Sequence, residues 1–277
     1  MNRFVRIVAV LAVFAPSIAL AQSGLSYDFT LSEKIDGQRS TSTGHASVSP
    51  TSVRMDFSGK TSLAKIGMTE LGDSMSIIQS DTGAAKLITL VNHRDKQYVQ
   101  FSPAAMMAKM QDAMKGMSGM PSMDFTGSAV TVDSLGPGGE IAGYNTLLYR
   151  MNMTLKISVS GQPVGEQDLL ADYYVVPELK DFAVGSAILG AASDESGSVP
   201  GIPKAFTEQL NAASKRIGAA MAVKVSIDGR SSMFGTGSMK TQTLEISNIR
   251  KTDVPPSAFV APAGYKKIVP KGMEKLM

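Results

Sequence analysis

The feature that most restricts the fold is a strict two-residue alternation over residues 149–159. Its large apolar members are Tyr149, Met151, Met153, Leu155, Ile157 and Val159, and the residues between them are polar. Successive side chains of a β-strand point to opposite faces, so the pattern predicts a strand with one apolar face and one wet face. At about 3.3 Å per residue this strand is about 35 Å long. Such strands are typical of a curved antiparallel sheet with one solvated face.

Shorter runs of the same alternation occur along most of the remaining chain. They predict further strands at residues 25–32, 52–57, 74–80, 86–92, 96–101, 167–176, 222–228 and 239–249. Gly83, residues 92–95 and the sequence Gly161-Gln162-Pro163 supply turn-forming residues between strands. The order of strands and turns therefore predicts one large antiparallel sheet.

Three segments are predicted to be helical. Residues 104–116 are rich in Ala, Met, Lys and Gln and follow Ser102 and Pro103, which suit a helix start. Residues 203–221 carry apolar side chains near helical spacing, and residues 179–192 form a weaker pattern. Together with the strands, these segments predict an α+β fold. We expect a single β-rich domain, residues 22–277, with a curved antiparallel sheet and two or three helices on one face.

The N-terminus predicts a cleaved export signal. Arg3 and Arg6 precede an apolar run at residues 7–14, and the small-residue sequence Ala19-Leu20-Ala21 follows. This order is typical of a secretory signal peptide over residues 1–21, with Gln22 as the first mature residue. The apolar run is too short to span a bilayer, so we expect no permanent membrane anchor. The mature protein is therefore expected in the periplasm or outside the cell.

Composition excludes several classes of function. Without the two arginines of the signal, 25 basic residues stand against 24 acidic ones. A balance near zero argues against nucleic acid as a partner, because nucleic-acid binders concentrate excess Lys and Arg. The chain has no cysteine, which excludes thiol catalysis, zinc–thiolate sites and iron–sulfur clusters.

No catalytic constellation can be assembled from the sequence. It contains no G-x-S-x-G elbow, no H-E-x-x-H helix and no P-loop. A Ser–His–acid arrangement would have to use His45 or His93, the only two histidines of the chain. Both lie in predicted strands or turns, where an exposed histidine is the ordinary case. We therefore expect a protein that is not an enzyme and needs no cofactor.

Methionine is unusually frequent, with 18 in the chain, and several gather at nearly helical spacing in residues 104–116. A helix rich in Met and Ala is an adaptable cover for an apolar groove. This hypothesis makes the helix a lid over the long strand. Its ligand-facing residues would be Met106, Met107, Met110 and Met114 of the helix, with Met151, Met153, Leu155 and Ile157 of the strand.

The same region allows a second hypothesis, a copper site. Met114, Met117, Met120 and Met123 recur every third residue on a segment that also contains glycine and proline. Thioethers are soft ligands that suit Cu(I) in an oxidising compartment. Copper-binding sequences tend to mix histidine or acidic residues among the methionines, and here only Asp112 and Asp124 are close. The apolar-surface interpretation is therefore preferred, with copper as the alternative.

The C-terminus carries a distinctive ending, Phe259 followed by Pro262-Ala263-Gly264-Tyr265-Lys266-Lys267. It resembles the P-x-G-Y-K-K ending of a family of exported bacterial proteins described as a domain of unknown function. Arg54-Met55-Asp56 and Gly143-Tyr144-Asn145 are similar to shorter motifs of that family. In physical terms, we expect Pro255 and Pro256 to end the last strand, because proline offers no ladder donor. We expect Phe259 and Tyr265 to pack against the sheet.

The family is similar in fold to periplasmic lipoprotein carriers of the LolA/LolB type. That resemblance implies a half-open antiparallel barrel with helices closing its mouth and an apolar cavity inside. It also implies a carrier or binding role for an apolar ligand, such as a lipid or a lipid-modified chain. The alternatives are a Cu(I)-binding protein and a structural or stress-related envelope protein without a small ligand.

Overall fold

The computed structural model describes residues 22–58, 74–83, 85–106, 108–109, 123–125, 127–186, 204–217, 220–232 and 238–269. The predicted signal peptide, residues 1–21, lies outside this set. The first strand begins at Gln22, the predicted first mature residue. Among the described residues, no helix is long and apolar enough to cross a membrane.

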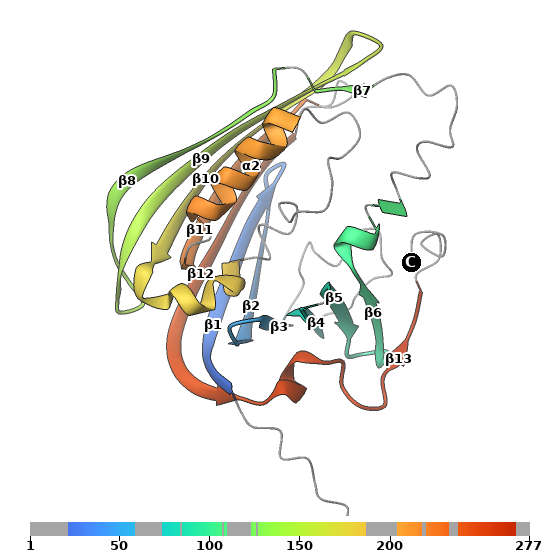
Figure 1. Ribbon diagram of the computed structural model, residues 1–277, viewed down its shortest axis with the longest axis vertical. Coiled ribbons are helices and arrows are strands. Elements are labelled where there is room, and N and C mark those ends of the chain that lie inside the picture. Colours follow the sequence, from blue (N-terminus) through green and yellow to red (C-terminus); the bar gives the residue numbers. More distant parts are fainter. Residues whose placement is uncertain are drawn as a thin grey trace, which may run out of the picture.

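The strands of the described residues form one 13-stranded sheet (Figure 1). Their bounds are β1 Gln22–Ile35, β2 Gln38–Val48, β3 Ser52–Ser58, β4 Ser74–Asp81, β5 Lys86–Asn92, β6 Gln97–Phe101, β7 Met123–Asp124, β8 Ala129–Ile141, β9 Tyr144–Val159, β10 Gln162–Val176, β11 Met221–Ser231, β12 Ser238–Val254 and β13 Lys266–Lys267. Their order in the sheet is β13-β6-β5-β4-β3-β2-β1-β12-β11-β10-β9, with β7 and β8 both on β9. Among the described strands, only the β6–β13 pair is parallel. In the described part of the chain β13 does not pair with β7 or β8, so the sheet is unclosed.

The 3-10 segment η2 (Pro177–Ser186) shows which face of the sheet is concave. It touches both β3 and β11, which three other strands separate in the sheet. Figure 1 shows the sheet curving around this segment. Leu179 of η2 is 1% exposed and belongs to the main core cluster with Phe57 and Met221. The core therefore lies on the concave face.

Side chains at every second position of β1 point into this concave core. Leu25, Tyr27, Phe29 and Leu31 are all buried. Phe29 lies opposite Gly44 of β2, and its ring meets that of Phe57 edge to face at 4.9 Å. A Cβ on Gly44 would lie 2.3 Å from the Phe29 Cζ atom. Glycine at this position is therefore what lets the two aromatic rings meet.

The helix α2 (Lys204–Ile217) covers the concave face at β8 and β9. Phe206 and Ala213 are buried against Val130 of β8. The Gln209 side-chain oxygen accepts the Val130 N–H at 3.0 Å, and the Arg216 guanidinium donates to the Val132 carbonyl at 2.9 Å. Because β8 is an edge strand, these bonds occupy backbone groups that would otherwise face solvent.

The predicted α+β class with a curved antiparallel sheet is confirmed, and each predicted strand is found. β2 and β8 were not predicted. The first consists largely of Ser, Thr and Gly, and the second contains the turn-like sequence Gly136-Pro137-Gly138-Gly139. β2 shows little hydrophobic alternation, because its inward-facing positions hold small residues such as Gly44 and Ala46.

The helix predictions need correction. The segment predicted as a helix at residues 179–192 contains most of η2, which is a 3-10 segment with non-helical torsions at Leu179 and Phe182. Residues 187–192 of that segment lie outside the described set. The helix predicted at 203–221 ends at Ile217, and Met221 begins β11. Of the helix predicted at 104–116, residues 104–106 and 108–109 are helical. Ser102 caps it, since its Oγ accepts the Ala105 N–H at 3.4 Å.

Candidate functional site

The concave face carries a band of apolar side chains across β9, β10 and β11. The register places Met153, Leu169 and Gly229 in one row, and Met151, Ala171 and Ile227 in the next. Ala171 is fully buried, whereas the large side chains of both rows keep part of their surface exposed. A continuous, partly exposed apolar band on a concave surface is suited to contact with an apolar molecule.

The predicted ligand-facing residues of the long strand lie on this concave face. Met151, Met153 and Leu155 pack against the cluster of Phe206 and Ala213, and Ile157 is 9% exposed. The structure thus places α2 over part of this surface, a role that the sequence alone had given to residues 104–116.

The predicted methionine lid is described only in part. Met106 is half-buried, and its N–H donates to the Ser102 carbonyl at 3.0 Å. Met107, Met110 and Met114 lie outside the described residues. Their contact with the concave face stays a prediction.

The copper hypothesis also concerns residues outside the described set, namely Met114, Met117 and Met120. Met123 begins β7, where it pairs with Val159 of β9. Within the ranges that the structure covers, no group of three or more His, Asp or Glu side chains is arranged to hold a metal ion. A Met-only Cu(I) site stays a prediction.

A second cluster lies on the opposite, convex face and was not predicted. Strand register aligns Asp28 of β1 with His45 of β2, then Asp56 of β3 and Ser76 of β4. His45 Nδ1 lies 3.0 Å from the Asp28 carboxylate, which also accepts the Asn248 amide at 2.8 Å. These two hydrogen bonds lower the pKa of Asp28 below its ordinary value. The row ends near His93, so both histidines of the chain lie on this face.

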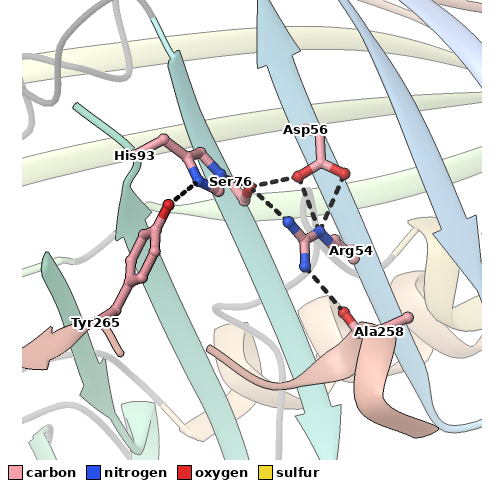
Figure 2. Close-up of polar contacts among 6 residues, drawn as sticks. All are labelled: Arg54, Asp56, Ser76, His93, Ala258 and Tyr265. Atoms are coloured by element: carbon pink, nitrogen blue, oxygen red, sulfur yellow. Dashed lines mark hydrogen bonds and ion pairs between the residues drawn. The ribbon is translucent and has the colours of Figure 1, made fainter. Parts of the chain in front are cut away.

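The centre of this convex-face cluster is the Ser76 hydroxyl (Figure 2). Its Oγ contacts the Asp56 carboxylate, His93 Nε2 at 2.5 Å and an Arg54 guanidinium nitrogen at 3.4 Å. Arg54 Nε reaches both oxygens of Asp56 at 2.8 and 3.0 Å. His93 Nδ1 lies 3.0 Å from the Tyr265 hydroxyl. We call these five residues the Ser76 network.

Hydrogen-bond accounting fixes the direction of these contacts. A serine hydroxyl has one proton and two lone pairs. The Asp56 carboxylate can only accept, so it takes the Ser76 proton, and Arg54 can only donate, so it uses one lone pair. His93 must then donate Nε2–H to the other lone pair, and its Nδ1 accepts the Tyr265 O–H. We therefore assign neutral His93 as the Nε2–H tautomer.

This assignment argues against a nucleophilic serine. In a Ser–His–Asp triad the histidine accepts the hydrogen bond of the serine hydroxyl, whereas here the Ser76 hydroxyl donates that hydrogen bond to the Asp56 carboxylate. Ser76 is also 0% exposed, so no substrate carbonyl can reach its Oγ in this conformation. The Ser76 network is a polar anchor between strands and the C-terminus.

Burial lowers the pKa of His93 below its ordinary value, and the Arg54 charge lowers it further. The Asp56 carboxylate acts in the opposite direction and is the smaller influence. His93 is half-buried and hydrogen-bonded, so its interpretation as an ordinary exposed histidine was wrong. These contacts could not be predicted from the sequence, because the members of the Ser76 network come from four separate segments of the chain.

The family-like motifs of the sequence meet in the Ser76 network. Arg54 and Asp56 belong to the R-M-D strand, and Tyr265 belongs to the C-terminal ending. As predicted, β12 ends before Pro255, Phe259 is buried, and Tyr265 packs against a core cluster. The two motifs were noted separately in the sequence, and only the fold shows that they are in contact.

The solved structures similar to this chain include three proteins of two kinds. A LolA superfamily protein from Nitrosomonas europaea has a TM-score of 0.33 at 8% identity, covering 86% of this chain and 90% of that chain. A putative outer membrane lipoprotein-sorting protein domain from Vibrio parahaemolyticus has a TM-score of 0.31 at 10% identity, covering 85% and 88%. A DUF1329 family protein from Desulfovibrio piger has a TM-score of 0.29 at 7% identity, covering 83% and 86%.

No protein-family model matches this sequence, and no curated protein matches it. These three structures are LolA-type proteins and a member of a family of unknown function, the kinds that the sequence resemblance named. TM-scores at this level carry no argument about a ligand.

Proposed function

We propose that this chain is an exported carrier or binding protein for an apolar ligand, a lipid or a lipid-modified chain. The ligand lies along the concave face of the sheet, which forms one wall of a half-open barrel. The observation that carries the proposal is the apolar band on β9, β10 and β11, where Met153, Leu169 and Ile227 keep part of their surface exposed on the concave face.

The two faces of the sheet differ in a way that supports this role. On β10, Leu169, Ala171 and Tyr173 face the concave side together with the apolar side chains of β9. The convex face of the same strands is laced by ion pairs, such as Arg150 with Asp172 at 2.7 Å. A polar outer face keeps the protein in water while the inner face offers apolar contact.

Helix α2 is the described element that serves as a cover. It lies across the concave face beside the apolar band, and its buried side chains reach Met151 and Met153. The methionine-rich residues 104–116 extend this cover as a second, adaptable wall. Flexible thioether side chains suit a ligand of variable shape, such as an acyl chain.

Export fits this proposal. The predicted signal peptide delivers the chain to a compartment where lipids and lipid-modified proteins must cross water between membranes. There an apolar groove shields cargo that would otherwise aggregate, because exposing acyl chains to water is unfavourable by about 0.8 kcal/mol per methylene group.

Native mass spectrometry of the protein released from the periplasm tests the proposal. We expect a population carrying one added mass in the range of a lipid, lost on extraction with organic solvent. The matched variants are Leu169→Gln and Leu170→Gln, adjacent leucines on the concave and convex faces of β10. The first should lose most of the added mass and the second should keep it. A wild-type protein without any added mass, or equal loss in both variants, would contradict a ligand on the concave face.

A further inference from the structure

After β12, residues 255–268 fold back over the convex face, and we call this segment the C-terminal strap (Figure 1). Its apolar contacts form a small separate core. Phe259 is 6% exposed and packs with Ile78 and Val91, the outward-facing residues of β4 and β5. The strap therefore seals the convex side of the strands that carry the Ser76 network.

Five polar contacts hold the strap in place, of which the Lys267 ammonium makes one, to the Gln100 side-chain oxygen at 3.5 Å. Lys266 N–H donates to the Lys96 carbonyl and Ile268 N–H to the Tyr98 carbonyl, both at 2.9 Å, along the edge of β6. Arg54 donates to the Ala258 carbonyl at 3.3 Å. The Tyr265 hydroxyl meets His93 Nδ1, and the two rings lie edge to face at 5.7 Å. Of these contacts, only the one between Tyr265 and His93 joins the strap to a group that titrates near neutral pH.

The contact depends on the charge state of His93. Neutral His93 accepts the Tyr265 proton at Nδ1, because its Nε2–H is committed to Ser76. A proton added to the ring must go to Nδ1, where it removes the acceptor. The Tyr265 hydroxyl must then reverse from donor to acceptor, and its own proton loses the His93 acceptor. The imidazolium also shares the Ser76 Oγ with the Arg54 guanidinium, so protonation places a second cation beside the side chain that holds the Ala258 carbonyl of the strap.

Of the neighbouring charges, the Arg54 guanidinium opposes that proton, and the Asp56 carboxylate favours it less strongly. From β3, Arg54 lies close and Asp56 is already held by Arg54 through two bonds. β4 contributes only the neutral Ser76 hydroxyl. In the turn after β5, Arg94 pairs with Asp95 at 3.2 Å. From the strap itself come the Tyr265 hydroxyl and the exposed Lys266.

We propose that the C-terminal strap is a pH-sensitive clasp, closed while His93 is neutral and loosened when His93 takes up a proton. The sign follows from linkage. His93 has a lowered pKa in the closed form, so the open form binds a proton more readily, and the closed form loses stability as the pH falls through about 6.5, the ordinary histidine value. The clasp works without a ligand and is independent of the carrier proposal.

Hydrogen exchange of the Lys266 and Ile268 amides in the full chain measures the clasp directly. Protection factors, corrected for the intrinsic pH dependence of exchange, are compared at pH 7.5 and pH 5. We expect severalfold lower protection of both amides at the lower pH in the wild type. His93→Gln keeps a donor for Ser76 and cannot titrate in this range, so its protection should be the same at both values. Protection that still falls in His93→Gln would overturn the proposal.

The second histidine supplies the control. His45→Gln removes the other imidazole, and the loss of protection at pH 5 should persist in it. If the loss of protection at pH 5 disappeared in His45→Gln, the titrating group would be His45 and not His93, and the proposal would be overturned. A nitrogen-15 imidazole spectrum of the wild type adds a test that needs no variant. Neutral His93 should show the Nε2–H tautomer and a pKa below the ordinary value, and the Nδ1–H tautomer would contradict the mechanism.

Discussion

At the scale of single residues, the firmest feature of the molecule is the fork between Arg54 and Asp56. Arg54 is the one member of the Ser76 network that bonds to a carboxylate, a hydroxyl and a backbone carbonyl of the strap. A guanidinium suits this position because its donors are fixed in one plane and always charged.

Arg54→Ala should therefore destabilise the protein by about 1–3 kcal/mol, the usual cost of removing hydrogen bonds to a charged partner. Arg54→Lys should recover only part of this, because an ammonium cannot form the two-pronged contact with Asp56. Urea unfolding followed by circular dichroism measures the difference. Arg39→Ala changes an exposed arginine of β2 and should alter stability by less than about 0.5 kcal/mol. Equal midpoints for the Arg54 and Arg39 variants would show that the network does not stabilise the fold.

A second residue-scale prediction concerns Gly44, where Phe29 leaves no room for a Cβ. Gly44→Ala should cost about 1–3 kcal/mol, because a methyl group there must push back the aromatic ring and the Asp56 backbone. Gly229 is the matched control, since a Cβ at that strand glycine meets its nearest atoms at 3.7 and 3.9 Å. Gly229→Ala should leave the thermal midpoint nearly unchanged. Equal thermal midpoints for Gly44→Ala and Gly229→Ala would contradict the tight packing of Phe29 against Gly44.

At the scale of elements, α2 and the C-terminal strap cover opposite faces of one sheet. The helix lies over the concave side of β8 and β9, and the strap lies over the convex side of β3 to β6. Each closes a patch of apolar residues that the strands alone would expose. We infer that the strap stabilises the sheet, whereas the helix covers part of the apolar concave surface.

Truncation of Phe206 tests the packing of α2. Phe206 is 5% exposed and sits in the cluster of Val130 and Ala213, so Phe206→Ala should cost about 3–5 kcal/mol. Lys215→Ala on the exposed side of the same helix should cost little. The two free energies of unfolding come from urea titrations of the purified proteins. A Phe206 variant as stable as the Lys215 variant would mean that α2 is not docked on the sheet.

The elements also show how far the sequence could predict the fold. Strands such as β9 were predictable because large apolar residues alternate with polar ones over their whole length. β8 was missed because its glycines and Pro137 resemble a turn, although bulges at these positions let it follow β9. β2 was missed because its inward positions include Gly44 and Ala46, which lie opposite Phe29 and Tyr27 and are too small to produce a hydrophobic alternation. At Gly44 the Phe29 ring leaves no space for a side chain.

The candidate sites divide in the same way. The concave face of β9 was predictable from alternation alone, since period two assigns Met151 and Met153 to one face. The Ser76 network was not predictable, because its members lie on β3, β4, the turn after β5 and the strap. Pairwise register between strands, which the sequence does not encode locally, is what brings Asp56 opposite Ser76.

At the scale of the whole molecule, the sheet is a curved, unclosed surface with two chemically distinct faces. Its convex face is polar and partly sealed by the strap, and its concave face joins the main core to a partly exposed apolar band. The carrier proposal places an elongated apolar ligand on this curved, one-sided apolar surface. Binding of the ligand on this concave surface is the central claim of the proposal.

Photo-crosslinking with a diazirine-bearing palmitic acid tests this claim most directly. The purified protein is irradiated with the probe, digested, and the modified residues are located by mass spectrometry. The carrier proposal predicts adducts on concave-face residues such as Met153, Leu169 and Ile227, with unmodified palmitic acid competing them away. Adducts confined to convex-face residues such as Leu170, or labelling that palmitic acid does not reduce, would contradict it.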